Sequence, residues 1–353
     1  MIFRTRSFET LFHLGFRKVR KWHVSKSPPC CEVERGEVMK KTWYLIIGVV
    51  LLVIGCIAYG YHEHHKPKTA QELKTVRVAY LPITHALPVF ATKELETADG
   101  PVHVELVKYG SWPELMDALN TGKVDAASVL VELGVKAREQ GIDVRAAALG
   151  HTEGNIIIVN KDINSVQDLK GKSFAIPHKQ STQKILVDLM LEQVGLSEKD
   201  VQIVEMSPPE MPSALSVGQI AGYSVAEPFG SLALEMGTGK VFEDPDHLWH
   251  DNICCALVFN GQFVDEHHDL AKAFTKAYLD AGTYLDEHPK AQEEISLKYM
   301  KFNDSVIERS LKVIGFKDLA LTEDRYNALV HHMTHIDLIK KVPSYSEFVD
   351  TSL

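Results

Sequence analysis

Histidine and cysteine are the residues of this chain whose types and spacing could do chemistry. His62, His64 and His65 fall within four residues, and His331 and His335 stand one helical turn apart, where two imidazoles can share a metal ion. The second group has no obvious acidic partner motif, and the first lies in a polar stretch with a proline. We therefore interpret the first group as part of a solvated linker and the second as surface or partner-contact histidines, and we assign no metal site and no cofactor.

The five cysteines do not make a disulfide framework. Cys30 and Cys31 are adjacent, Cys254 and Cys255 are adjacent, and Cys56 stands alone. Neighbouring cysteines bridge one another only with strain. Because Cys254 and Cys255 lie in an apolar run, we interpret them as buried free thiols on a strand rather than as a redox pair.

Several enzyme motifs are absent from the sequence. It contains no Gly-x-Ser-x-Gly and no His-Glu-x-x-His. Residues 236–240 are glycine-rich but lack the spacing of a phosphate-binding loop, and we expect a helix end and a turn there. We predict no catalytic residue.

The charge distribution excludes one class of partner. The chain has 353 residues and a net charge of −9, and 45% of its residues are hydrophobic, as in an ordinary globular protein. Residues 1–55 are basic, so the remainder is more acidic than the total suggests. Such a surface repels phosphate backbones, and we expect no nucleic-acid binding.

The N-terminal region has the composition of a targeting segment. Residues 43–59 are apolar and uncharged and follow Lys40 and Lys41. Residues 53–56 resemble a lipobox, in which the cysteine is acylated and becomes the mature N-terminus, so we predict a signal peptide over 39–55 and lipidation of Cys56. An uncleaved signal anchor is the alternative. Both place the body outside the cytoplasm.

Two further segments flank this one. Residues 1–38 are too long and basic for a secretory n-region, and our hypothesis is an extension upstream of the true start at Met39. Residues 56–75 are polar and contain a proline, which is typical of a tether between a membrane anchor and a folded body.

From Val76 onward, short β-branched runs alternate with amphipathic stretches. This pattern predicts an α/β protein with strand-helix-strand units and a mainly parallel sheet. Beyond Gly261 only helices are expected. The expected strands are 76–81, 102–109, 126–130, 144–149, 156–159, 173–176, 201–205, 221–225 and 253–259.

Three of the expected helices begin with capping chemistry. The starts are Ser111-Trp112-Pro113, Ser181-Thr182-Gln183 and Glu227-Pro228. In an open α/β sheet, helix N-termini that follow strands gather at one edge, where their N–H groups favour an anion. A cleft lined by several of them would suit a small anion.

Together these segments resemble the solute-binding proteins of ABC importers for nitrate, sulfonates, taurine and bicarbonate. The motifs that carry the resemblance include Gly122 to Ala126, Asp168 to Lys172 and Pro208 to Leu215, in addition to the helix starts above. The resemblance implies a two-lobed type II periplasmic-binding-protein fold with the ligand cleft between the lobes. Lobe one would be residues 76–152 and 254–353, and lobe two 153–253, with crossings near 151–155 and 251–255.

The resemblance also implies ligand-binding residues. We expect cleft contacts from Ser111, Trp112, Asn155, Ser181, Thr182 and Gln183, followed by Thr84, His85, Glu227 and His250. The nitrate and bicarbonate relatives carry lysine in place of His250, which weakens a strict nitrate assignment. Glu227 is either a helix cap or, facing the cleft, a partner for a cationic group.

The function implied is that of a lipid-anchored receptor on the extracytoplasmic face of the cell membrane. It would deliver a small anion to the transmembrane permease of an ABC importer, with lipid bilayer and permease as its partners. A receptor for a thiamine-precursor aminopyrimidine is the alternative. An enzyme related to the fungal pyrimidine synthases of the same fold has less support, because the cysteine pair alone does not reproduce their cysteine-rich run.

Overall fold

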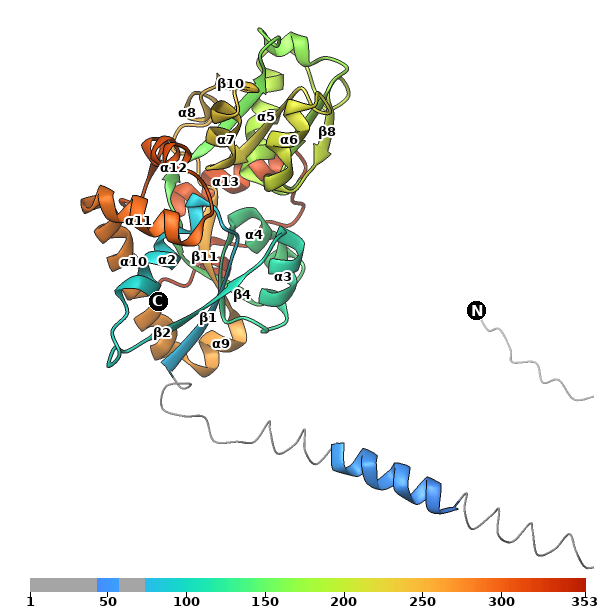
Figure 1. Cartoon of the computed structure of the whole chain (residues 1–353), viewed down its shortest axis with the longest axis vertical. Coiled ribbons are helices and arrows are strands. Elements are labelled where there is room, and N and C mark those ends of the chain that lie inside the picture. The colour runs from blue at the N-terminus through green and yellow to red at the C-terminus, as the bar shows by residue number, and fades with distance from the viewer. Residues whose placement is uncertain (1–42, 57–73) are drawn as a thin grey trace, which may run out of the picture. The chain divides into compact units, whose positions relative to one another are not determined.

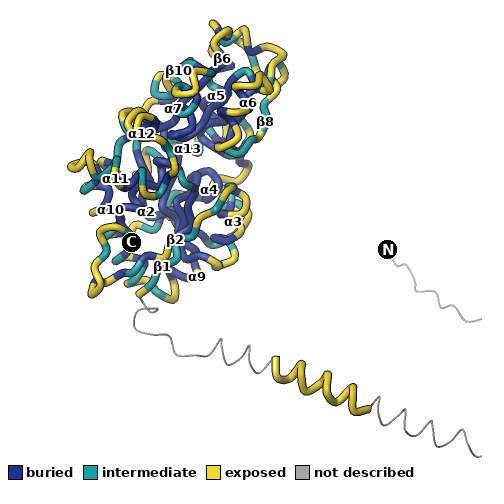
Figure 2. The backbone as a smooth tube through the Cα atoms, in the orientation of Figure 1, coloured by how far each residue is buried: buried dark blue, intermediate teal, exposed yellow. Residues whose placement is uncertain are grey.

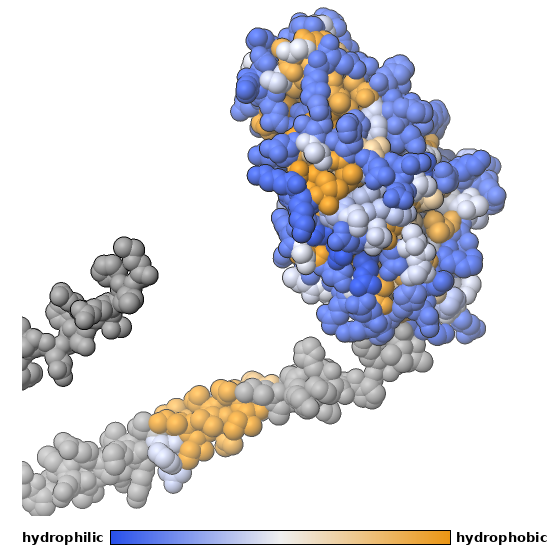
Figure 3. All heavy atoms as spheres, turned by 180° about the vertical axis from the view of Figure 1, so that it is seen from behind, coloured by the Kyte–Doolittle hydropathy of each residue, from blue (hydrophilic) through white to orange (hydrophobic). Residues whose placement is uncertain are grey.

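The computed structural model describes residues 43–56 and 74–353. Residues 43–56 form a helix with exposed side chains, drawn in blue in Figure 1 and hydrophobic in Figure 3. Within the described ranges, no helix is both long and apolar enough to cross a membrane. The predictions for residues 1–38, for the start of the signal peptide and for most of the 56–75 tether, including its three histidines, lie outside the described residues.

The first of two five-stranded sheets has the order β2-β1-β3-β11-β4. Its strands are β1 (Thr75–Tyr80), β2 (His103–Lys108), β3 (Ala126–Leu130), β4 (Val144–Leu149) and β11 (Cys255–Asn260). Strand β1 is parallel to β2 and β3, and β11 is antiparallel to β3 and β4. Its helices include α2 (Leu87–Leu95), α3 (Trp112–Asn120), α4 (Val131–Glu139), α9 (Gly261–Glu266) and α10 (His268–Glu287).

The second sheet has the order β10-β6-β9-β7-β8. Its strands are β6 (Asn155–Asn160), β7 (Ser173–Ile176), β8 (Gln202–Glu205), β9 (Gly222–Ala226) and β10 (Gly239–Glu243). The helices around it are α5 (Thr182–Glu192), α6 (Met211–Ser216) and α7 (Phe229–Glu235), together with the short α8 (Pro245–Leu248). We refer to the two sheets with their helices as the first and second lobes, which Figure 1 shows as the lower and upper parts of the body.

All nine expected strands are present, and four of the five strands in each sheet run in the same direction, as expected of mainly parallel sheets. One strand in each sheet departs from this direction. Strand β6 is antiparallel to β9 and β10, and β11 is antiparallel to both of its neighbours. These two strands are the ones that the chain enters directly from the other lobe, and each runs against its neighbours. Strand β10 was not predicted, because the glycines of residues 236–240 indicated only a helix end and a turn.

The chain passes between the lobes twice. It leaves the first sheet after Leu149 and enters the second at Asn155, then leaves the second after Glu243 and returns at Cys255. On the first passage, β5 (Thr152–Glu153) pairs with β12 (Ile314–Gly315). Both passages contain non-glycine residues with positive φ, Glu153 at 58° and Asp251 at 55°. The two passages therefore bend sharply where they meet.

The C-terminal helices contact both lobes. Helix α11 (Pro289–Tyr299) packs on α2, and α12 (Asp304–Ser310) packs on α7. Helix α13 (Glu323–His335) contacts the second lobe through a hydrogen bond between His335 and Glu192. The remaining elements are η2 (Thr84–Ala86), η3 (Val166–Leu169), η4 (Pro208–Glu210), η5 (Leu311–Val313) and α14 (Tyr345–Phe348).

The core lies on both faces of the two sheets, where Figure 2 shows the strands as buried. Every residue of β3, β9 and β11 is buried. Strands covered on both faces are apolar throughout rather than alternating, which explains the continuous hydrophobic runs in the sequence. These three strands therefore lie in the interior of the body.

Glu139, at the end of α4, holds the C-terminal segment. Its carboxylate accepts hydrogen bonds from the backbone N–H groups of Lys340 at 2.7 Å and Lys341 at 2.9 Å, and it pairs with Lys136. The Lys136 hydrogen bond, followed by the two backbone hydrogen bonds, lowers the pKa of Glu139 to about 2. The charged carboxylate is therefore the form that the folded protein stabilises.

We predict that Glu139→Gln lowers the melting temperature at neutral pH by a few degrees. A carboxyl whose pKa is lower in the folded protein than its unfolded value of 4.5 stabilises the fold at pH values above 4.5. This stabilisation is lost as the pH falls through the pKa of the folded protein. The gap between variant and native protein in a pH series of melting curves should therefore narrow below about pH 4.5. Glu308→Gln, which removes an exposed pair with Lys312, is the control and should change little. A gap that widens in acid would contradict the assignment.

Candidate functional site

Two imidazoles and two thiols meet where the passages between the lobes come together. His85, His151, Cys254 and Cys255 are all buried, and one ligand atom from each lies within 4.8 Å of the others. His85 belongs to η2, His151 to the first passage, Cys254 to the end of the second, and Cys255 to the start of β11. The topology thus brings together residues that are far apart in the sequence.

The orientation of the His85 ring is fixed by a backbone carbonyl. Nε2 of His85 lies 2.9 Å from the oxygen of Gly154. A carbonyl oxygen only accepts, so Nε2 carries the hydrogen and donates it. The other nitrogen, Nδ1, lies 3.5 Å from the sulfur of Cys255 and 3.6 Å from that of Cys254. In the neutral ring, the lone pair of Nδ1 therefore faces the two sulfurs.

Glycines make room for this arrangement. Gly154 has a φ of +82°, and a Cβ there would lie 3.0 Å from Nε2 of His85 and 2.8 Å from Ile314. A Cβ at Gly150 would lie 2.9 Å from the backbone oxygen of His85. Side chains at these positions would push η2 away from the first passage, so both glycines are needed for the approach.

His151 is buried with both ring nitrogens lacking a hydrogen-bond partner. Its ring lies against that of His85, with centroids 3.6 Å apart and planes tilted by 35°. Burial, followed by the charge of His85, lowers the pKa of His151 to about 4. The ring is therefore neutral at physiological pH, and one of its nitrogens keeps a lone pair.

The two cysteine sulfurs face each other and the histidines. They lie 3.8 Å apart, far beyond a disulfide bond. Burial alone raises the pKa of the Cys254 thiol, but the hydrogen bond from Cys255 and the charge of His85 outweigh burial and hold it well below its usual value. Burial and the neighbouring Cys254 raise the pKa of Cys255. Cys254 is thus the sulfur that more readily becomes a thiolate.

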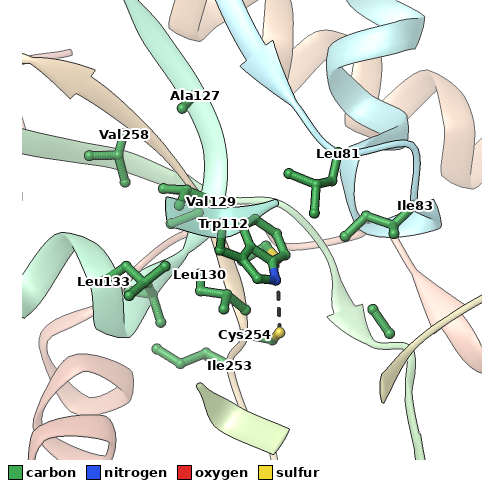
Figure 4. Close-up of a cluster of buried hydrophobic side chains, with 14 of the residues drawn as sticks. Leu81, Ile83, Trp112, Ala127, Val129, Leu130, Leu133, Ile253, Cys254 and Val258 are labelled. Atoms are coloured by element: carbon green, nitrogen blue, oxygen red, sulfur yellow. Dashed lines mark hydrogen bonds between the residues drawn. The ribbon is translucent and has the colours of Figure 1, made fainter. Parts of the chain in front are cut away.

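Side chains from the second lobe border the cluster. Nε2 of Gln183 donates to Oδ1 of Asn155 at 2.7 Å and lies 3.4 Å from the sulfur of Cys254. Asn155 in turn donates to Asn252 at 3.1 Å. Oε1 of Gln183 is buried without a partner. Figure 4 shows the indole nitrogen of Trp112 directed toward Cys254.

Thr182 joins the lobes through one hydroxyl group. Its Oγ1 lies 2.5 Å from Oε1 of Glu132 on α4 and 2.7 Å from the backbone oxygen of Ile253. A hydroxyl has one hydrogen, so it donates to one neighbour and accepts from the other. The carbonyl cannot donate, which leaves the Glu132 carboxyl as the donor. A carboxyl that donates must be protonated. Burial, followed by the charge of Cys254, raises the pKa of Glu132 well above its usual value, which favours the protonated form.

We predict that Glu132→Gln changes the unfolding free energy by less than about 0.5 kcal/mol, because an amide N–H can replace the acid's donor, whereas Thr182→Val costs about 1–3 kcal/mol. Urea unfolding of the two variants beside the native protein measures this. Comparable large losses in both variants would show that Glu132 is charged.

Of the predicted site residues, five meet at this junction. Trp112, Asn155, Thr182, Gln183 and His85 lie together, as described above. Ser181 is buried beside them and caps α5, accepting a hydrogen bond from the backbone N–H of Lys184. Ser111 is at the N-cap position of α3 but its side chain makes no cap hydrogen bond.

Three predicted residues have other roles. The backbone N–H and hydroxyl of Thr84 both donate to the backbone oxygen of Glu227, which ties η2 to the second lobe. The Glu227 carboxylate accepts from the N–H and hydroxyl of Ser231 in the first turn of α7, so the helix-cap interpretation holds. His250 has a side chain 89% exposed and bonded to Asp246, apart from the cluster.

His151, Cys254 and Cys255 were not among the predicted site residues. The sequence contains a signal for them, because the expected crossings near 151–155 and 251–255 include all three. The apolar run around the cysteines is equally typical of strand packing, so the run alone does not indicate that the two crossings bring these residues together.

Two cavities approach the junction. One of about 260 Å³ is lined by Ser111, Trp112, Pro177 and His178, among others. Another of about 570 Å³ is lined by Gly154, Asn155 and Asn252, with Lys312 and several acidic residues further out. The buried cluster therefore lies behind residues that solvent can reach.

The chain resembles known binding proteins. The ligand-binding component of an ABC-type import system from Staphylococcus aureus, solved with zinc bound, is 36% identical, with a TM-score of 0.75 over 79% of this chain and 97% of that one. A putative aliphatic sulfonates-binding protein of Bacillus subtilis is 29% identical over 78% of this chain and 82% of its own length.

A nitrate import ATP-binding protein of Synechocystis is 25% identical to this chain. The match covers 61% of this chain and only 36% of that larger protein. Sulfonate- and nitrate-binding proteins of known structure share the periplasmic-binding-protein fold with this chain, which confirms the predicted fold class. The model of the NMT1-like family matches residues 69–298. The chain belongs to the NMT1-like family of solute-binding proteins.

Proposed function

We propose that this protein is the receptor of an ABC importer, which captures a small solute between its lobes and presents it to the permease. The observation that carries this proposal is the buried junction, where polar side chains of both lobes meet and where His151 and Gln183 have atoms without partners. Unused polar groups in a closed site are costly unless a ligand satisfies them. The relatives, which include sulfonate- and taurine-binding proteins and the ligand-binding component of an ABC-type import system, support the same role.

The solute is a small molecule that the junction can enclose. A small anion such as nitrate or a sulfonate is supported by the relatives' names and by the N–H donors of Gln183, Asn155 and Trp112. The aminopyrimidine alternative depended on a free Glu227, and the helix cap leaves it without that support. The zinc of the Staphylococcus relative adds a metal ion as a further candidate.

A thermal-shift series tests the receptor function. The full chain in detergent is heated with nitrate, bicarbonate, taurine, alkanesulfonates, an aminopyrimidine and zinc. A cargo at 100 times its dissociation constant should add about 2.7 kcal/mol of stability. We expect Gln183→Leu to reduce the shift and His250→Ala, at the surface, to leave it intact. Shifts equal in both variants would place the ligand elsewhere.

We further propose that Cys56 is acylated and holds the receptor at the extracytoplasmic face of the membrane. The support is the lipobox-like sequence of residues 53–56 at the end of the apolar helix. Two acyl chains suffice for stable membrane attachment of a folded domain. The body would then act close to the permease.

We predict that Cys56→Ser abolishes incorporation of an alkynyl fatty acid in living cells, with Cys254→Ser, in the folded body, as the control that retains it. Labelling is read after gel separation and click coupling to a dye. A chain that stays in the membrane fraction with no label in either variant would instead be an uncleaved signal anchor.

A further inference from the structure

We propose that the cargo site is a metal site, in which Nδ1 of His85, one ring nitrogen of His151, and the sulfurs of Cys254 and Cys255 bind a zinc ion. This inference rests on the proposed receptor function and names its substrate class. Two thiolates and two imidazoles form one of the common ligand sets of tetrahedral zinc.

The distances within the cluster fit that ion. Zinc–sulfur bonds of about 2.3 Å and zinc–nitrogen bonds of about 2.0–2.1 Å place tetrahedral ligands about 3.8 Å apart for two sulfurs and about 3.5 Å apart for sulfur and nitrogen. The observed separations are 3.8 Å between the sulfurs, and 3.5 Å and 3.6 Å from Nδ1 of His85 to each. These three separations match a tetrahedron, and the His151 ligand atom lies within 4.8 Å of the other three.

The surroundings of the ligands are those of a metal centre. A metal-binding histidine usually donates its second N–H to a carbonyl or carboxylate, which fixes the ring. His85 does so to Gly154 at 2.9 Å. An ion would give one of the two unpartnered ring nitrogens of His151 a ligand bond. The buried lone pair on that nitrogen would then be used.

Packing alone explains the cluster less well. Core cysteines are ordinary, but a neutral imidazole with no hydrogen bond, stacked on a second imidazole and two thiols, leaves buried polar atoms unsatisfied. A bond between the adjacent cysteines would require the sulfurs to approach from 3.8 Å to about 2.05 Å. Metal binding leaves the two sulfurs at their observed separation.

The position of the cluster favours cargo over a structural ion. A structural zinc typically holds together a small domain that lacks its own core. Here both lobes have extensive cores, and the cluster lies between the two passages, with Gln183 of the second lobe 3.4 Å from Cys254. An ion bound on the first lobe would thus be covered by the second, as a receptor covers its solute. Each sulfur that binds as thiolate releases its proton to solvent.

The test measures zinc binding by the full chain in detergent, reduced and then stripped with a chelator. All variants carry His62→Ala, His64→Ala and His65→Ala, so that the tether histidines cannot bind the metal. We expect about one zinc ion per chain by calorimetry and elemental analysis, and more than about 100-fold weaker binding in Cys254→Ser and in His151→Ala. His331→Ala should bind as the parent does.

Two further readouts separate the outcomes. Cobalt(II) in place of zinc should give thiolate-to-metal charge-transfer absorption that Cys254→Ser reduces. The stripped protein should still unfold cooperatively in urea, because its cores do not depend on the ion, and loss of the fold on stripping would overturn the cargo role. Binding unchanged in both ligand variants, or binding of copper(I) alone, would overturn the zinc site.

The inference can fail while the receptor function stands. Stripped, folded protein that ignores zinc but is stabilised by nitrate, a sulfonate or taurine would overturn the metal site and support the receptor with an anionic cargo. Stabilisation by none of these probes would count against both.

Discussion

The hydrogen bond from Nε2 of His85 to the oxygen of Gly154 is the contact on which the junction depends. It crosses from η2 to the passage between the lobes, and it decides which nitrogen of the ring faces the sulfurs. It is possible only because Gly154 adopts a positive φ and has no Cβ to meet the ring. The backbone carbonyl of Gly154 thus holds the His85 side chain of the first lobe against the first passage between the lobes.

Closure of the lobes rests on a second set of contacts around the same point. Thr182 contacts both Glu132 and Ile253, Thr84 donates twice to the backbone of Glu227, and the C-terminal α12 packs on α7. The hydrogen bonds among these contacts lie near the passages. Buried apolar residues of both lobes also belong to one continuous cluster, so polar and apolar contacts together hold the lobes in the arrangement seen.

Sequence reasoning predicted the strands well, because buried β-branched runs mark them clearly. It also brought Asn155, Gln183 and Trp112 to one cleft through the family resemblance. It did not indicate that the side chain of His250 is exposed and bonded to Asp246, since nothing local in the sequence records this. It did not indicate that His151 and the cysteine pair lie close together, because their proximity depends on two crossings that meet in space. A single apolar run resembles ordinary packing at every position.

The directions of β6 and β11 were likewise not evident from the sequence. Each strand runs antiparallel to its neighbours in its own sheet. Strand direction within a sheet depends on which lobe the chain arrives from, and local composition carries no record of it. The sequence pattern therefore predicts where the strands lie along the chain. Which strands and passages lie side by side at the junction is evident only from the three-dimensional structure.

The most direct test of a ligand enclosed at this junction is a crystal structure of the zinc-loaded protein, with anomalous scattering measured at the zinc absorption edge. The account predicts one strong peak within about 2.0–2.3 Å of His85, His151, Cys254 and Cys255, with the lobes closed over it. An anomalous peak at surface histidines, with the junction empty of metal, would contradict it.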